Sequence, residues 1–145
     1  VSCEDVNCPV AGAGDECEIA LIASIGENPF ETNTATPSSP QPDDTICPGT
    51  YLDWGNSQDI WFQFVPEASG DLLFTTCDAS SYDTSMAIYE NSCDNQVACN
   101  GDSSDGSGCQ AYFSAVNMNV TAGETYYIRI GGWEGSAGSG TLTIE

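Results

Sequence analysis

The sequence has almost no basic side chains. It holds a single Lys or Arg, Arg129, and no His, against 22 Asp and Glu, so its formal net charge is -21. Phosphate groups and anionic membrane surfaces repel such a chain. The absence of His and Lys also removes the bases that activate Ser and Cys nucleophiles. We therefore expect no nucleic-acid partner, no membrane insertion and no enzyme activity, although a pair of carboxylates is a hydrolytic device that composition leaves open.

The chain also lacks long apolar runs and any helical repeat of apolar residues. No stretch approaches the roughly 20 apolar residues that span a bilayer. Short β-favouring segments instead alternate with turns rich in Gly, Pro, Asn and Asp. The 145 residues fit one domain with two packed layers. We predict an all-β, antiparallel β-sandwich of eight or nine short strands, over residues 18–25, 28–34, 60–64, 72–76, 85–89, 96–99, 111–120, 125–131 and 141–144.

The stretch from Asp59 to Tyr89 organises the predicted sheets. Ile60, Phe62 and Phe64 alternate with their neighbours, as in a strand with one core face. A Pro-Glu-Ala-Ser-Gly turn then leads into residues 72–76. These two segments are expected to form a β-hairpin, with residues 85–89 as a third consecutive antiparallel strand.

Cysteine is abundant, and the eight residues match no zinc-binding spacing. Disulfides in an oxidising compartment are therefore the expected use. We predict that all eight are paired, as Cys3–Cys8, Cys17–Cys47, Cys77–Cys109 and Cys93–Cys99. The sequence begins at Val1 without a charged and apolar leader, which is typical of a secreted protein whose signal has been removed.

Two segments differ from the rest in composition. Residues 1–14 are poor in apolar side chains, so we interpret them as an extension that a disulfide or a neighbouring subunit orders, before a single domain over residues 15–145. Residues 36–48 contain four prolines, which lack the donor that a strand needs. This segment is expected to be a surface loop held by Cys47, with a ligand-binding loop as the alternative.

Seven motifs follow one another in the order found in a known family. They are Asp-Glu-Cys-Glu-Ile-Ala (15–20), Asn-Thr-Ala-Thr (33–36), Asp-Ile-Trp-Phe-Gln-Phe (59–64), Ser-Gly-Asp-Leu-Leu-Phe-Thr-Thr-Cys (69–77), Tyr-Asp-Thr-Ser-Met-Ala-Ile-Tyr (82–89), Ala-Cys-Asn-Gly-Asp (98–102) and Thr-Ala-Gly-Glu-Thr-Tyr-Tyr-Ile-Arg-Ile-Gly-Gly-Trp (121–133). From residue 15 onward the chain thus resembles the bacterial pre-peptidase C-terminal domain family. The resemblance implies a jelly-roll-like β-sandwich that serves as a secreted, non-catalytic module of hydrolases and surface proteins. Some members bind calcium or polymeric substrates, but Gly101 stands where relatives often carry Asp.

Oxygen-rich turns are the candidate metal site. Calcium takes several carboxylate and carbonyl oxygens from irregular backbone. The candidate ligands are Asp78, Asp83, Asn100, Asp102 and Asp105, in two loops. Solvated turns are the alternative interpretation, because Asp and Asn favour turns for their local hydrogen bonds.

Aromatic residues in loops are the candidate ligand-binding groups. Trp54, Trp133 and Tyr82 are expected to stack on sugar rings or to fill a partner's pocket, whereas Trp61 lies in a core strand and is expected to pack there. Arg129 is expected to pair with an internal carboxylate rather than to clamp a ligand.

Three classes of function follow from these observations. We favour a self-associating structural subunit of a bacterial extracellular fibre or surface layer, stabilised by calcium, with copies of itself or other surface proteins as partners. A binding appendage of a secreted hydrolase, with a polysaccharide or protein ligand, is the alternative, and an enzyme is the least favoured class.

Overall fold

The computed structural model describes residues 12–47, 52–78, 81–103 and 112–145. These residues contain strands and short 3-10 helices but no α-helix. The strands are β1 (Leu21–Ile22), β2 (Gly26–Glu31), β3 (Ile60–Phe64), β4 (Gly70–Thr75), β5 (Thr84–Glu90), β6 (Gln96–Asn100), β7 (Ala115–Val120), β8 (Tyr126–Gly132) and β9 (Ser139–Ile144), and the 3-10 helices are η1 (Cys17–Ile19), η2 (Asp44–Ile46) and η3 (Trp133–Gly135). The predicted all-β fold class is confirmed.

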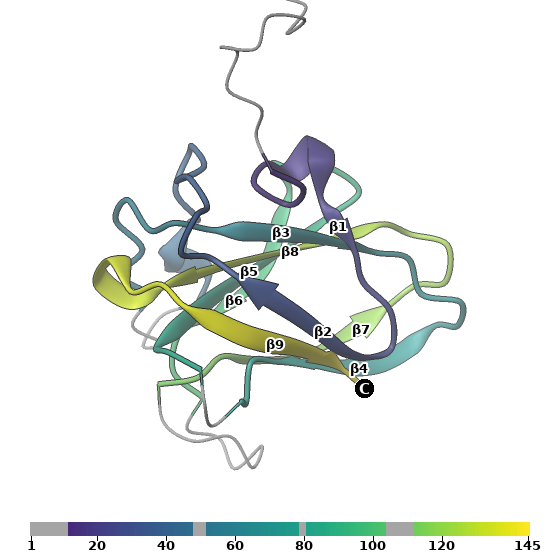
Figure 1. Cartoon of the computed structure of the whole chain (residues 1–145). Helices are drawn as coiled ribbons and strands as arrows, with labels where there is room; N and C mark the ends of the chain where they lie inside the picture. Colours follow the sequence, from purple (N-terminus) through teal and green to yellow (C-terminus); the bar gives the residue numbers. More distant parts are fainter. Residues whose placement is uncertain (1–11, 48–51, 79–80, 104–111) are drawn as a thin grey trace, which may run out of the picture.

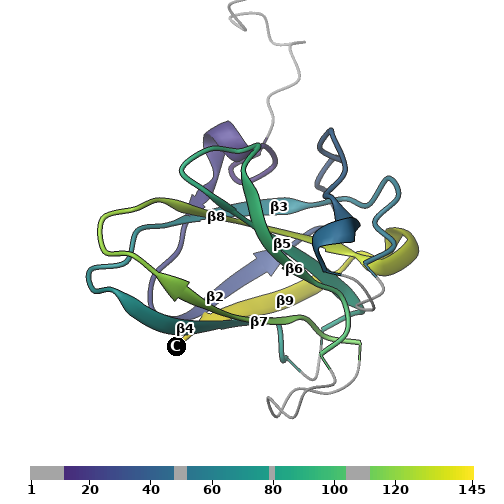
Figure 2. The same ribbon diagram turned by 180° about the vertical axis from the view of Figure 1, so that it is seen from behind.

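The strands form two sheets that pack face to face. One sheet has five strands in the order β1-β3-β8-β5-β6, and the other has four in the order β2-β9-β4-β7. All pairs of neighbours are antiparallel except β1 with β3. Figure 1 shows β2, β9 and β4 in the nearer layer, and Figure 2 shows the sandwich from behind, with β5 and β6 nearer. The chain is therefore the predicted β-sandwich.

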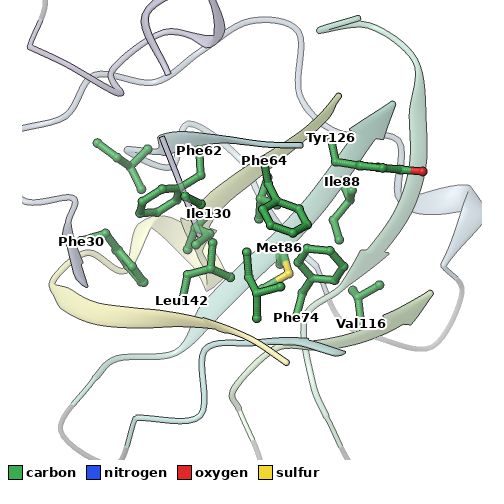
Figure 3. Close-up of a cluster of buried hydrophobic side chains, with 14 of the residues drawn as sticks. Phe30, Phe62, Phe64, Phe74, Met86, Ile88, Val116, Tyr126, Ile130 and Leu142 are labelled. Atoms are coloured by element: carbon green, nitrogen blue, oxygen red, sulfur yellow. The ribbon is translucent and has the colours of Figure 1, made fainter. Parts of the chain in front are cut away.

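Period-two alternation in the strands builds the core between the sheets. Ile60, Phe62 and Phe64 of β3 point inward, as do the alternate residues of β5 and β8. Aromatic rings meet edge to face across the layers, with 6.1 Å between the ring centroids of Phe64 and Phe74. Figure 3 shows these side chains converging from both sheets. Such pairs add to the free energy that burial of apolar surface supplies.

The predicted hairpin between residues 60–64 and 72–76 is wrong. These segments form β3 and β4, but β3 belongs to the five-stranded sheet and β4 to the four-stranded sheet. Alternation shows only that each strand has a core face, and a short connection serves to cross between two sheets as well as to turn within one. The hairpin of this region is formed instead by β5 and β6.

A second hydrophobic cluster covers the outer face of the five-stranded sheet. Trp61, Ala87 and Tyr89 point to this face, opposite to their core-facing neighbours. Leu52 and Trp54, from the segment before β3, lie over them. The five-stranded sheet is thus buried on both faces, which explains why β5 is apolar at successive positions.

The first predicted strand is much shorter than expected. The first two residues of the predicted strand 18–25, Glu18 and Ile19, belong to η1, and only Leu21 and Ile22 pair with β3. The amide of Gly14 donates to the carbonyl of Ile19 at 2.7 Å, which closes a turn where a strand was expected. The next strand, β2, begins at Gly26 and is an edge strand, which tolerates the missing donor of Pro29.

Two of the predicted disulfides are wrong. Cys17 pairs with Cys93, and Cys47 pairs with Cys99, in place of Cys17–Cys47 and Cys93–Cys99. The turn of the β5–β6 hairpin carries Cys93 toward η1. The side-chain amide of Gln96 on β6 both donates to and accepts from the backbone of Asp43, at 2.9 and 2.8 Å, which holds η2 and hence Cys47 beside β6.

The other two predicted disulfides involve cysteines outside the described residues. Cys77 is disulfide-bonded, but its predicted partner Cys109 lies outside the described residues. The predicted pair Cys3–Cys8 and most of the predicted extension 1–14 also lie outside them. Within the described ranges, no helix is long and apolar enough to cross a membrane.

Replacing Cys47 and Cys99 by Ala should lower the free energy of unfolding by about 2 to 5 kcal/mol, because the bridge constrains the unfolded chain. The measurement is chemical denaturation of the variant and the wild-type protein. Peptide mapping after pepsin digestion without reductant should recover the peptides of Cys17 and Cys93 joined. A peptide joining Cys93 to Cys99 would contradict the connectivity described here.

Candidate functional site

At one end of the five-stranded sheet, β8 and β6 end beside the start of β5. In the register, Thr84 at the start of β5 pairs with Gly132 at the end of β8, and Met86 pairs with Asn100 at the end of β6. The residues just beyond these strands therefore gather at one place. They include Asp83 before β5, Trp133 after β8 and Asp102 after β6.

A cavity of about 250 Å³ opens between these strand ends, lined by Asp83, Asp102, Tyr112 and Trp133. We call it the Asp83–Trp133 cavity. The amide of Trp133 donates to the carbonyl of Asp83 at 3.0 Å, which ties the end of β8 to the start of β5. The amide of Ser103 donates to the carbonyl of Phe113 at 2.7 Å, which brings the loop of Asp102 beside that of Tyr112. Main-chain contacts thus hold the four side chains together.

Buried hydroxyl groups support the strand ends beside the cavity. The hydroxyl of Thr84 lies 3.2 Å from that of Ser114, whose own hydroxyl donates to the carbonyl of Thr84 at 3.0 Å. The hydroxyl of Thr76 bonds to that of Thr84 and accepts from the amide of Ser114 at 3.0 Å. All three side chains are fully buried. A satisfied network of this kind fixes β4, β5 and β7 against one another.

Asp83 has an unfavourable electrostatic environment. Its Oδ1 atom is buried and has no hydrogen-bond partner among the described residues. Burial, together with the charge of Asp102, raises the pKa of Asp83 to about 6. Burial also raises the pKa of Asp102. The ionised pair is therefore a place where a positive charge would be stabilising.

The other predicted metal ligands are not part of this cavity. Asp78 accepts a hydrogen bond from the hydroxyl of Thr141 at 3.1 Å, and Asn100 accepts one from the amide of Ala115 at 3.0 Å. Asp105 lies outside the described residues. In the part of the chain that the structure describes, no three Asp, Glu, Cys or His side chains are grouped as metal ligands. Two of the five predicted ligands are thus brought together, as a pair.

The predicted aromatic residues fall in different environments. Trp133 is half-buried and lines the cavity. Tyr82 instead packs its ring against Phe30 and bonds its hydroxyl to Thr32 at 3.0 Å, and burial raises the pKa of Tyr82 to about 12. Trp54 is 4% exposed, so its prediction as a surface residue is wrong. It is buried because it lies on Arg129 and on Gly131, where any side chain would meet its ring.

Tyr112 is the cavity residue that the sequence did not reveal. It falls in the predicted strand 111–120, but β7 begins only at Ala115. Tyr112 is 63% exposed and has a φ of 75°, a conformation that side chains adopt at a cost of about 1 to 3 kcal/mol. Glu134, next to Trp133, also has a positive φ of 48°. Strained residues of this kind are concentrated at functional sites.

Arg129 organises the outer face of the five-stranded sheet. Its Nε donates to Asp59 at 2.7 Å, which confirms the predicted internal ion pair. Its terminal nitrogens donate to the carbonyls of Pro40 and Ser38, each at 2.8 Å, and to the Tyr89 hydroxyl at 3.1 Å. The guanidinium also lies within about 5 Å of the rings of two tryptophans, Trp54 and Trp61. Its donors are thus used internally, and they hold the proline-rich loop on the sheet.

Comparison with known proteins gives a match among solved structures. No protein-family model and no curated protein sequence matches the chain. Among solved structures, the chain is similar to the pre-peptidase C-terminal domain of a collagenase from Bacillus anthracis, with a TM-score of 0.53 and 11% identity over 87% of this chain and 94% of that one. The fold is thus that of a pre-peptidase C-terminal domain, as the resemblance in the sequence implied.

Replacing Arg129 by Met should lower the free energy of unfolding by about 3 to 5 kcal/mol, because it leaves the buried carboxylate of Asp59 without its partner. The double variant Arg129→Met/Asp59→Leu should lose less, since no uncompensated charge remains. Chemical denaturation at pH 7 compares the two. A double variant that is less stable than Arg129→Met would show that the ion pair is not the source of the loss.

Replacing Asp83 by Asn should stabilise the protein at pH 7.5 but have little effect at pH 3.5. Because folding raises the pKa of Asp83 from 3.8 to about 6, the folded state holds the proton more tightly, and its stability falls as the pH rises through this range. Melting temperatures in sodium buffer without amines or divalent cations test this. The control is Asp71→Asn, at an exposed position of β4. Equal shifts for both variants at pH 7.5 would contradict the prediction.

Proposed function

We propose that this chain is a non-catalytic module of a secreted bacterial protein that works by self-association, as a subunit of an extracellular fibre or surface layer. The observation that carries the proposal is an exposed apolar surface at one side of the sandwich. Its residues are Ile22, Ile25 and Val65, which are 77%, 61% and 46% exposed. We call it the Ile22–Val65 surface.

The Ile22–Val65 surface continues into a groove. The groove is lined by Ala23, Ile25, Phe64, Val65 and Leu72 among others, so it reaches side chains of the core. Apolar side chains that are scattered singly over a surface need no explanation, but Ile25 and Val65 line the same groove, and apolar side chains gathered in this way mark a site of association. Burial of this surface against a second copy would remove it from water and stabilise the pair.

The edges of both sheets lie close to the same surface. β1 and β2 are edge strands of different sheets and are joined by only three residues, Ala23 to Ile25. β1 pairs at two positions only, so it covers little of its sheet. Edge strands present backbone donors and acceptors to which a neighbouring chain adds by strand pairing. An apolar surface beside two sheet edges therefore supports assembly at this side.

Charge decides the conditions under which copies associate. The single basic side chain is buried in the ion pair with Asp59, so the exposed carboxylates find no basic side chain on a second copy. Copies therefore repel one another unless cations screen them, and this repulsion extends about 10 Å at 0.1 M salt. We propose calcium as the counterion between subunits, because carboxylate oxygens are its preferred ligands.

The side chains that are present support a non-catalytic role. The sequence has no His or Lys, and Arg129 is fully engaged by the fold. The solved neighbour is one domain of a collagenase, which supports the interpretation of the fold as a module of a larger protein. A binding appendage for carbohydrate or protein is the second candidate, favoured by the Asp83–Trp133 cavity. An appendage of this kind would stay monomeric in calcium.

Sedimentation velocity tests the assembly. The wild-type protein should form oligomers at high concentration in millimolar calcium and be monomeric in chelator at the same ionic strength. Ile22→Glu should stay monomeric in calcium, because it places a charge in the apolar contact. The matched control is Ile46→Glu, at a side chain that is 46% exposed elsewhere on the surface. A wild-type chain that stays monomeric in calcium would refute self-association.

A further inference from the structure

We propose that the Asp83–Trp133 cavity binds an alkylammonium group that another molecule supplies. The cavity combines two features that such a group requires, aromatic side chains and negative charge. This site is separate from the Ile22–Val65 surface and does not depend on self-association.

The aromatic lining suits an organic cation. Trp133, the first residue of η3 after β8, and Tyr112, in the loop before β7, both line the cavity together with the two carboxylates. Trp is the side chain that attracts cations most strongly through its ring, and each such contact contributes about 0.5 to 2 kcal/mol. A volume of about 250 Å³ holds a small ammonium group and its methyl substituents. Tyr112 is exposed and has a positive φ, so the fold holds an aromatic residue in the lining at a local conformational cost.

The carboxylates supply the opposing charge. Asp83 has a buried oxygen without a partner in the described part of the chain, and an ammonium N–H or a methylated ammonium in the cavity would compensate it. Asp102 lies near enough to act on Asp83 electrostatically. Of the described residues that line the cavity, these two are the charged ones. A cation in the cavity would therefore relieve the repulsion between the two carboxylates.

A divalent metal ion fits the same lining less well. Calcium takes six to eight oxygen ligands. Among the residues that the structure describes, the lining offers the carboxylates of two, and its other members are aromatic. A metal ion would keep most of its water there, whereas an alkylammonium group loses water more readily than a divalent ion and contacts aromatic rings directly. The lining thus selects the organic cation.

The ligand cannot be a basic side chain of a second copy. The chain contains one basic residue, Arg129, which is 2% exposed and bonded to Asp59. An ammonium group on a side chain must therefore belong to a different molecule, such as a protein that carries exposed lysines. Every copy in an assembly would present the same cavity to that molecule.

Three ligands with a common backbone test the proposal in the intact chain. They are Nα-acetyl-lysinamide, its ε-trimethylated form and Nα-acetyl-norleucinamide, which lacks the amine. NMR titration in sodium buffer follows the backbone amides of Asp83 and Asp102. Both cationic ligands should shift these signals to saturation, and the norleucine compound should not. The tighter of the two cations identifies a methylated or a primary ammonium as the natural group.

Variants assign the binding to the cavity. Tyr112→Ala and Asp102→Asn should each weaken binding about tenfold, which corresponds to about 1.4 kcal/mol. Both positions are in loops, and Asp71→Asn on β4 is the control that removes the same charge elsewhere. Norleucinamide binding equal to that of the lysine ligand would overturn the proposal. Unchanged affinity in both cavity variants would overturn it as well. So would displacement of the lysine ligand by calcium when the calcium concentration is below that of the ligand.

Discussion

The buried guanidinium of Arg129 is the interaction on which the outer half of the molecule depends. A charge is costly to remove from water unless it is paired and hydrogen-bonded. Here Asp59 supplies the opposite charge, and the carbonyls of Ser38 and Pro40 satisfy the remaining donors. Those carbonyls belong to a loop whose prolines prevent a regular ladder. The loop therefore owes its position to a side chain of β8, and it in turn places η2 and Cys47 beside β6. One cation thus connects a loop, a disulfide and the second hydrophobic cluster.

Most of the strands were predictable because they have a strong local pattern, but their partners were not. Alternation located β3, β5, β6 and β8 to within about two residues, as is usual for element boundaries. It does not distinguish a hairpin from a crossing between sheets, so β3 and β4 were wrongly paired. The disulfides failed for a related reason. Short sequence separations favoured Cys93–Cys99, whereas Cys93 and Cys99 are carried to different partners by the hairpin and by η2.

The candidate site was predictable only in part, because it is built from strand ends. Polar turns contain Asp83, Asp102 and Trp133, and residues in such turns can be recognised from the sequence as candidates for a binding site. That they meet follows from the order β8-β5-β6, which the sequence does not contain. Tyr112 was hidden by its β-favouring neighbours, since β propensity reflects context more than the residue itself. Trp54 was misplaced because its flanking Gly and Asp indicate a loop, and a loop that covers a sheet is buried on its inner side.

Charge distribution links the two proposals to the fold. The chain places its one basic side chain inside and leaves most of its described carboxylates at the surface, so any partner that lowers its electrostatic energy has to be positive. Small cations supply positive charge everywhere on the surface and exchange freely with the solvent. They are therefore suited to screening the repulsion between copies. A site that selects one cation needs direct contacts that distinguish it from other ions. Aromatic rings beside a partly desolvated carboxylate pair provide such contacts. Assembly and ligand binding would therefore respond differently to salt. Screening ions promote contact between like-charged copies, whereas the same ions weaken an ammonium group's attraction to Asp83 and Asp102. High salt should favour the assembled state and empty the cavity.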